Sequence, residues 1–398
     1  MHRDIVLSAN IPWVIYNFRL ELIRELINND FSVSVIACSR KYFNNDKQYI
    51  SKIINEGCKF YHVNIDFMGT NPLKDFKTFI NYLSLYKKIK PDIILNYTIK
   101  PNIYGTLAAR LLRIKVINNI SGLGTLYIKQ NLYTKIATIL YKFSQRYASK
   151  IFFQNKDDLF LFTKSYKLVD IRKVDLLPGS GIDTTKYTPV NNNGKMKRKN
   201  EFNFIVVARM LRDKGIEEYV QAARILKSRY ENINFQLLGF LESENKSAIT
   251  KAQMDNWVSE KLVTYLGSTN YVIKYYNNAD CVVLPSYREG IPRSLLEAAS
   301  LEKPIITTDV PGCRDVIDDG INGFLCKMKN PIDLANKMEK MLQLNNEERA
   351  KMGKRGREKI CKEFNVDIVI KKYLQAIEEA IENNTRLFRR ILDVLNFK

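Results

Sequence analysis

CVVLPSYREGIPRSLLE, residues 281–297, joins an apolar run to a helical pattern across a short turn. The run at 281–284 has the length of a buried strand, and the turn places Glu289 before the helix begins. In an open parallel sheet, the carboxyl end of a strand and the amino end of the next helix form a crevice whose free backbone N–H groups attract phosphate. The stretch therefore predicts an α/β protein with a ligand site at Glu289.

A second carboxylate follows eight positions later, at Glu297. This spacing puts it about two turns along the helix, so one carboxylate can reach a sugar and the other a ribose. A solvated loop glutamate and a helix-surface glutamate have the same spacing, and two such residues are more often merely exposed. The rest of the chain has to decide between the two interpretations.

Short apolar runs alternate with amphipathic segments through most of the chain, which is the rhythm of right-handed βαβ units in a doubly wound sheet. The predicted strands of the first half are residues 5–9, 31–37, 59–63, 93–96, 116–118, 151–154 and 174–177. After a breaker cluster at 178–181 and a polar stretch, the predicted strands are 202–208, 234–238, 263–266, 281–285, 304–308 and 323–326. Helical segments in the first half include 18–27, 73–88, 103–112 and 133–147.

This pattern predicts two Rossmann-like domains, as expected for 398 residues. We place the first at residues 1–181 and the second at 182–365. Helical patterns at 347–362 and 366–382 follow the last strand, and we expect residues 366–398 to pack back on the first domain. The tail, 385–398, has apolar residues on one helix face and arginines elsewhere, which suits either the protein body or anionic lipid.

The chain is strongly basic, with 63 Lys and Arg against 42 Asp and Glu and a net charge of +21. Residues 93–156 hold ten Lys and Arg without a single acid. Nucleic acid, an anionic membrane and a phosphorylated substrate all fit such a surface, as does a solvated face without a partner. The six cysteines show no CxxC pairing and predict buried free thiols in a reducing compartment. With no apolar run of membrane-spanning length and no signal peptide, we expect an intracellular protein, at most peripheral to a membrane.

Arg209 ends another predicted strand, and Lys214 follows five positions later at a helix entry. Two cations at the mouth of a crevice suit a diphosphate, because a guanidinium fork and an ammonium grip different oxygens. Together with Glu289 and Glu297 they describe a site for a nucleotide diphosphate that carries a sugar.

These residues and their order resemble the retaining glycosyltransferases of family four, which have the GT-B fold. The resemblance covers nearly the whole chain and includes 207–209 with 214–215, 237–239, 265–267, 279–280, 284–290, 296–298, 319–320 and 322–323. The ordered set is much more specific than the glutamate spacing alone.

The resemblance implies a role for each donor-side residue. Arg209 and Lys214 would hold the diphosphate and neutralise the leaving group, Glu289 would contact the sugar, and Glu297 would bind the ribose. The rest of the implied donor site comprises Gly290, Ile291, Pro292, Leu266 and Gly267. It also implies a uridine diphosphate donor, front-face attack with retention, and no metal or other cofactor. Double displacement on a carboxylate is the alternative mechanism.

The acceptor side matches less closely, because the loop after the first strand lacks the glycines of many relatives. Asn17 and Arg19 resemble a bacterial subgroup that adds an N-acetylhexosamine or related sugar to polyprenyl diphosphate-linked saccharides. Lys100 and Asn102 stand where many relatives have a histidine region, and Gly122 and Gly124 follow the fifth strand. The resemblance thus implies a lipid-linked acceptor and a place on the inner face of the plasma membrane.

Two other functions fit parts of the sequence. A non-hydrolysing nucleotide-sugar 2-epimerase shares the fold, but it would use acids and histidines in the cleft, and the chain has only His2 and His62. A nucleic-acid-binding protein fits the charge and the aromatic content, but no nucleic-acid motif accompanies them. Neither a metal nor nucleic acid is expected as a partner.

Overall fold

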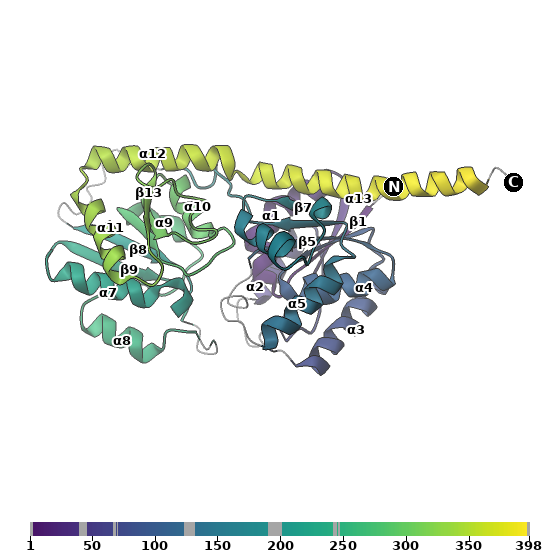
Figure 1. Ribbon diagram of the computed structural model, residues 1–398, viewed down its shortest axis with the longest axis horizontal. Helices are drawn as coiled ribbons and strands as arrows, with labels where there is room; N and C mark the ends of the chain where they lie inside the picture. Colours follow the sequence, from purple (N-terminus) through teal and green to yellow (C-terminus); the bar gives the residue numbers. More distant parts are fainter. Residues whose placement is uncertain are drawn as a thin grey trace. The chain divides into compact units, whose positions relative to one another are not determined.

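The computed structural model describes residues 3–39, 46–66, 69, 71–122, 132–189, 201–241, 245 and 247–395. Side chains are described from residue 135 in the helix that begins at 132, and only to residue 382 in the last helix. The chain divides into two compact units, shown in Figure 1. Unit 1 comprises residues 1–180 and 367–398, and unit 2 comprises residues 181–366.

Unit 1 is built on a parallel sheet whose described strands run in the order β3-β2-β1-β4-β5-β6-β7. The strands are β1 Arg3–Ser8, β2 Phe31–Ala37, β3 Lys59–His62, β4 Ile93–Tyr97, β5 Lys115–Ile120, β6 Lys150–Phe153 and β7 Val174–Leu176. The helices are α1 Pro12–Asn28, α2 Asp46–Asn55, α3 Pro72–Ile89, α4 Thr106–Leu111, α5 Leu132–Gln145, α6 Lys156–Phe160 and α13 Val366–Leu395. A π-helical turn, Pro101–Gly105, leads into α4.

Unit 2 has a second parallel sheet, in the order β10-β9-β8-β11-β12-β13. Its strands are β8 Phe202–Val207, β9 Ile233–Leu238, β10 Thr264–Tyr265, β11 Cys281–Leu284, β12 Ile305–Thr308 and β13 Gly323–Cys326. Its helices are α7 Ile216–Lys227, α8 Lys251–Ser259, α9 Val272–Asn278, α10 Arg293–Ser300, α11 Pro331–Gln343 and α12 Asn346–Glu363. The prediction of two Rossmann-like parallel-sheet domains is confirmed, and every predicted strand is present within two residues at either end.

Helices cover both faces of each sheet, which explains why the strands are continuous apolar runs rather than alternating ones. In β8, Phe204 joins the core on one face and Ile205 the core on the other, and both are fully buried. Ile5 and Val6 divide in the same way in β1. The runs therefore reflect two buried faces.

The last helix, α13, lies along unit 1 and is drawn in yellow in Figure 1. Tyr373 is fully buried, its ring lies 5.0 Å from that of Phe152, and its hydroxyl accepts a hydrogen bond of 2.7 Å from Asn119. The helix runs without a break from the predicted segment 366–382 into the tail, and ends at residue 395. The tail side chains from residue 385 lie outside the described residues. Of the helices described, none is both long and apolar enough to span a bilayer.

Candidate functional site

The predicted donor residues gather at the carboxyl edge of the unit 2 sheet, where its strand order reverses. β8 is flanked by β9 on one side and by β11 on the other. Arg209 follows β8, and Glu289 follows β11, so the two loops flank this switch point. Open α/β sheets bind ligands in the crevice that forms at such a point.

Lys214 and Glu289 form an ion pair across the switch point. Lys214 ends a 3-10 turn, Arg212–Lys214, just before α7, while Glu289 lies in the loop after β11. Their side chains are only 14% and 15% exposed, so the pair is shielded from bulk water without being sealed off. The Ser286 hydroxyl lies 2.7 Å from Oε1 of Glu289, which fixes the carboxylate further. The structure thus brings together two of the three predicted catalytic residues.

Hydrogen bonds join the loops that carry this pair. The backbone N–H of Tyr287 donates to the carbonyl of Asp213 at 2.9 Å, which holds the β11 loop against the turn that bears Lys214. Thr308, at the end of β12, donates through its hydroxyl to the carbonyl of Ser286. The N–H of Glu289 donates to the carbonyl of Pro311 at 3.1 Å. The site is therefore held by three adjacent strand ends.

Two glycines allow these loops to approach so closely. Gly215 has φ +72°, and a Cβ there would lie 2.0 Å from the carbonyl oxygen of Pro285. Gly312 has φ +82°, and a Cβ there would lie 2.1 Å from the carbonyl oxygen of Gly290. Both positions need the left-handed backbone and the missing side chain at once.

The amino end of α10 adds a partial positive charge to the same edge. Gly290, Ile291 and Pro292 are buried and lead into the helix, and Pro292 makes no side-chain cap. Helix amino ends with free N–H groups attract phosphate. Arg209 lies just after the end of β8, and its side chain is exposed at the same edge of the sheet. Lys214, Arg209 and this helix end therefore bring positive groups to the switch point, beside the carboxylate of Glu289.

Leu266 and Gly267 follow β10, further along the same edge. The N–H of Leu266 donates to Leu237 at 2.8 Å, and the carbonyl of Gly267 accepts from the N–H of Gly239 at 2.8 Å. Gly267 has φ +71° with open space around it. These contacts hold the loop after β10 against the loop after β9.

Glu297 lies on the buried side of α10 and accepts three hydrogen bonds. Its Oε1 accepts from the Tyr187 hydroxyl at 2.9 Å and from Nε of Arg293 at 3.1 Å, and its Oε2 accepts from the Tyr276 hydroxyl at 3.2 Å. A carboxylate offers about four acceptor positions, so capacity for one further donor remains. Burial, and then the charge of Glu297, raise the pKa of both tyrosines, which therefore remain protonated donors.

Sequence reasoning missed several residues that shape this site, among them Gly312, Ser286, Tyr187 and Tyr276. Tyr187 is 110 positions from Glu297 and belongs to no motif, so no local signal could have found it. Gly312 follows a predicted strand within a Pro-Gly pair, which is a turn signal that could have pointed to it.

In unit 1, the sheet order reverses between β1 and β4, and the predicted acceptor residues of α1 and the β4 loop flank that point. Asn17 donates from Nδ2 to the carbonyl of Trp13 at 2.9 Å. Arg19 is 4% exposed, and its guanidinium lies 4.4 Å from the ring centre of Tyr97. One of its nitrogens donates to the carbonyl of Phe18 at 2.7 Å, while Nε has no hydrogen-bond partner among the described residues.

Lys100 forms an ion pair with Asp75 and donates to the carbonyl of Gly69 at 2.9 Å. The Tyr104 hydroxyl donates to the same carboxylate at 2.9 Å. The carboxylate of Asp75, in the first turn of α3, thus neutralises the charge of Lys100. Asn102 is buried and donates to the carbonyl of Asn119 at 2.8 Å.

The two predicted acceptor-side glycines follow β5. Gly122 is described, with φ +126°. Gly124 lies outside the described residues.

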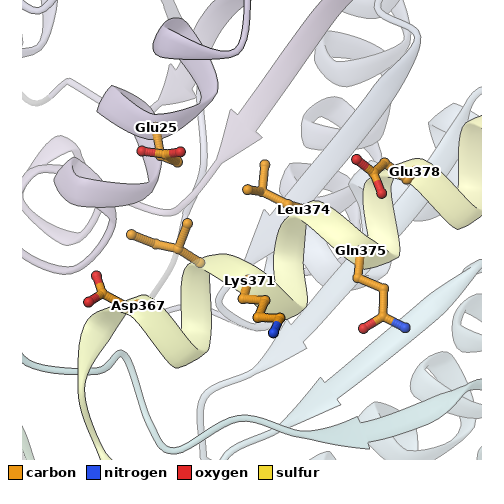
Figure 2. Close-up of a pocket in the computed structure, with 7 residues that line it drawn as sticks. Glu25, Asp367, Lys371, Leu374, Gln375 and Glu378 are labelled. Atoms are coloured by element: carbon orange, nitrogen blue, oxygen red, sulfur yellow. The ribbon is translucent and has the colours of Figure 1, made fainter. Parts of the chain in front are cut away.

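We also searched the described residues for a metal site and for other cavities. No group of three or more His, Cys, Asp and Glu side chains is arranged to hold a metal ion in the part of the chain that the structure describes. A hollow of about 600 Å³ lies between α1 and α13, lined by both acidic and apolar side chains (Figure 2). None of the predicted site residues lines this hollow.

Comparison with known families matches most of the chain in two segments. Residues 190–359 match the family described as glycosyl transferases group 1. Residues 4–155 match the family described as glycosyl transferase 4-like. The first segment contains Arg209, Lys214, Glu289 and Glu297.

Curated relatives extend over much of the chain. The N,N'-diacetylbacillosaminyl-diphospho-undecaprenol alpha-1,3-N-acetylgalactosaminyltransferase of Campylobacter jejuni is 28% identical over 93% of this chain and 96% of its own. The UDP-Gal:alpha-D-GlcNAc-diphosphoundecaprenol alpha-1,3-galactosyltransferase of Escherichia coli is 26% identical over 74% of this chain and 78% of its own.

Solved structures share the fold. A glycosyltransferase from Rickettsia africae has a TM-score of 0.76 at 18% identity, covering 96% of this chain and 99% of its own. Anabaena HepE, in complex with UDP and glucose, has a TM-score of 0.77 at 16% identity, covering 95% and 100%. At these identities the likeness concerns the fold alone.

Proposed function

Since the chain belongs to the family-four glycosyltransferases and has their GT-B fold, we propose that it transfers a sugar from a uridine diphosphate donor to a polyprenyl diphosphate-linked saccharide, with retention of configuration. The observation that carries the donor half is the Lys214–Glu289 pair at the switch point of unit 2. A cation that suits a diphosphate lies there beside a carboxylate that suits a sugar.

The proposed reaction needs positive charge where the leaving group departs. The bond between the anomeric carbon and the diphosphate oxygen breaks, the acceptor hydroxyl oxygen forms the new bond on the same face, and its proton passes to the departing diphosphate. Negative charge therefore builds on the leaving oxygen, and preorganised cations lower the barrier by several kcal/mol. Lys214, Arg209 and the amino end of α10 would supply that charge, without a metal.

Glu289 would accept hydrogen bonds from hydroxyls of the donor sugar. The ammonium of Lys214 would at the same time interact with the oxygens of the diphosphate. The ion pair holds both groups in place before the donor arrives, which limits the reorganisation that the reaction requires. Glu297 would bind the ribose through its remaining acceptor capacity. Because the carboxylate of Glu297 is held by three hydrogen bonds, it would fix the position of the ribose relative to the sugar bound at Glu289.

The acceptor half of the proposal has different support. The two relatives from C. jejuni and E. coli are named as acting on undecaprenol-linked diphosphate saccharides. A basic segment without acids, residues 93–156, fits the diphosphate of such an acceptor. We propose an N-acetylhexosamine as the transferred sugar and a peripheral position on the inner face of the plasma membrane.

A thermal-shift series with UDP, UDP-N-acetylgalactosamine, UDP-N-acetylglucosamine and UDP-galactose tests the donor site. A ligand present at about 100 times its Kd stabilises the native state by about 2.7 kcal/mol. We expect at least one uridine nucleotide to raise the Tm of the parent and to have a smaller effect on Lys214→Ala. Equal shifts in the parent and Lys214→Ala would contradict the assigned diphosphate site.

A further inference from the structure

The outward side of α5 carries apolar side chains where a helix on a sheet usually presents polar ones. Ile136, Ile139 and Phe143 are 47%, 67% and 49% exposed. At spacings of three and four residues they form one stripe along the helix. The opposite side is already occupied, since Tyr141, Ser144 and Gln145 are buried against the protein. The stripe is therefore additional to the face that holds α5 in the fold.

A row of cations runs beside this stripe. Lys135, Lys142 and Arg146 are exposed, and their spacing places them together on the neighbouring strip of the helix surface. The surrounding sequence, residues 93–156, contains no Asp or Glu that could neutralise them locally. The outward arc of α5 thus combines apolar and basic side chains without an acid.

Two members of this row, Lys142 and Arg146, also line a pocket at the carboxyl end of α5. The pocket has a volume of about 320 Å³, and its lining includes Lys142, Arg146, Lys167 and Lys173. Lys173 donates to the carbonyls of Arg146 and Ala148 at 2.8 and 3.0 Å, which fixes one wall. The single acid in the lining, Asp170, is bound by Arg172 at 2.6 Å. The pocket therefore presents a net positive charge.

Aromatic contacts extend the surface to α4. The rings of Phe143 and Tyr147 lie 5.6 Å apart, and the guanidinium of Arg110 lies 5.1 Å from the ring centre of Tyr147. Leu111, next to Arg110, is 63% exposed. Apolar and basic groups thus continue side by side across two helices.

We propose that this surface, formed by the outward face of α5, the adjoining end of α4 and the basic pocket, docks on an anionic lipid bilayer. Ile136, Ile139 and Phe143 would enter the boundary between head groups and acyl chains. The cations would contact lipid phosphates, and the pocket would hold one head-group phosphate. Charge complementarity together with the parallel apolar stripe favours a bilayer, because nucleic acid would satisfy the cations but leave the aliphatic side chains in water. The assignment rests on the proposed membrane association and gives it a location.

Vesicle binding tests the surface. The probes are vesicles of phosphatidylcholine alone and of phosphatidylcholine with about one third phosphatidylglycerol, in low salt. We expect the parent to prefer the anionic vesicles by at least tenfold. Ile139→Glu/Phe143→Glu and Lys142→Glu/Arg146→Glu should each lose most of that preference. Each cation near the surface contributes roughly fivefold.

A matched control changes the same residue types in unit 2. Ile332→Glu/Lys354→Glu alters an exposed isoleucine and an exposed lysine outside the proposed surface, and it should bind like the parent. Folding is followed by Tm, and the donor site by the Tm shift with UDP. A missing UDP shift with intact vesicle binding would count against the proposed function and leave the docking surface standing.

Three results would overturn the proposal. The first is unchanged anionic vesicle binding by both α5 variants. The second is loss of binding on deletion of residues 386–398 with no effect of the α5 variants, which would assign the membrane contact to the tail. The third is concentration-dependent self-association of the parent that the α5 variants abolish while vesicle binding is absent, which would make the stripe an interface between copies of the chain.

Discussion

At the level of single residues, the Lys214–Glu289 pair joins two functions that have opposite charge requirements. Diphosphate binding needs the ammonium, whereas sugar binding needs the carboxylate. In the structure each group neutralises the charge of the other. A bound donor would therefore have to interact with the ammonium and the carboxylate while these two groups remain paired. Removing one member leaves the other as a partly buried charge without its partner, which is costly in itself.

Glu289→Ala and Lys214→Ala should therefore each lower kcat by about 100-fold to 1000-fold, the usual loss when one preorganised charge is removed. The measurement is sugar transfer at saturating donor, with Tm as the test of folding. Glu231→Ala and Lys251→Ala, both at exposed positions of unit 2, are the controls and should transfer at the parent rate. Parent-like turnover by both site variants would remove the pair from the mechanism.

The three donors around Glu297 predict a different kinetic effect. Glu297→Gln keeps the shape but removes the charge, and we expect KM for the donor to rise about tenfold with a smaller change in kcat, since a hydrogen bond to a charged group is worth about 1.5–3 kcal/mol. Tyr187→Phe and Tyr276→Phe should show smaller increases. Tyr230→Phe is the matched control, because the Tyr230 hydroxyl also donates to a glutamate, Glu339, at 2.9 Å. A fall in kcat with KM unchanged would argue against a ribose-binding role.

Gly312 and Gly320 offer a test of the close approach between loops. Both have positive φ, +82° and +76°, but only at Gly312 would a Cβ meet another backbone. Alanine at either position carries the left-handed strain of about 1–2 kcal/mol. Gly312→Ala should in addition displace Glu289 and Gly290 and reduce sugar transfer at least tenfold, whereas Gly320→Ala should keep it. Equal activity of the two variants would show that the loop adjusts freely.

Sequence reasoning could bring candidate residues together where a parallel sheet dictates their position. Lys214 and Glu289 could be linked because each follows a strand of one parallel sheet, and such ends meet at one edge. Tyr187 could not be found, because its contact with Glu297 depends on the folded path of the chain. Lys100 is one of the predicted acceptor-side residues, but no local pattern indicated that Asp75, 25 positions earlier, forms an ion pair with it.

At the level of elements, α13 completes the core of unit 1. Val369, Tyr373, Ala376 and Ile377 belong to the same buried cluster as Ile5. This helix therefore contributes to stability through these buried side chains rather than through its intrinsic helix propensity.

Tyr373→Ala should lower the free energy of unfolding by about 3–5 kcal/mol, as for other large aromatic deletions in cores. Tyr373→Phe removes only the hydroxyl that accepts from Asn119 and should cost about 1 kcal/mol. Urea unfolding followed by circular dichroism measures both. Tyr271→Ala is the control, because Tyr271 is 82% exposed. Similar losses for Tyr373→Ala and Tyr271→Ala would contradict the packing of α13.

The elements themselves were largely predictable because both faces of each sheet are buried. This burial makes every strand a continuous apolar run, and the breaks between runs are polar or rich in glycine. Helix ends were harder to predict. α1 starts at Pro12, six positions before the predicted segment, since proline suits the first turn of a helix even where the apolar periodicity is weak.

At the level of the whole molecule, the cysteines report on the integrity of both cores. Five are buried and Cys361 is exposed. Burial raises the pKa of Cys58 and Cys326 to about 12, and burial together with Glu289 does so for Cys313. These thiols carry almost no thiolate near neutral pH, and the protein body shields them.

A thiol reagent such as Ellman's should therefore react with one cysteine in the native protein at pH 8 and with all six in denaturant. Cys361→Ser should abolish the rapid phase and leave the slow one. Cys58→Ser, at a buried position, should keep the rapid phase. Several thiols that react at the rate of Cys361 would show that the cores open readily.

Candidate residues for the proposed donor site were easier to identify than those for the proposed acceptor site, for a physical reason. A diphosphate and a sugar demand charges at fixed places, and the sequence shows such charges in order along unit 2. The sequence of unit 1 shows no comparably ordered set of charged residues. The acid-free segment indicated an anionic partner, but the outward stripe of α5 became visible only when burial distinguished Ile139 from Tyr141.

The return of α13 to unit 1 also dictates the order in which a growing chain can mature. Unit 2 is continuous in sequence, so it can complete its core as soon as residue 366 has left the ribosome. Unit 1 is translated first, yet it waits for residues of the last helix, such as Ile377 and Ala380, before Ile5 and Leu7 are fully covered. The first half of the protein therefore exposes an apolar face for most of translation, and this interval is when it most needs chaperones.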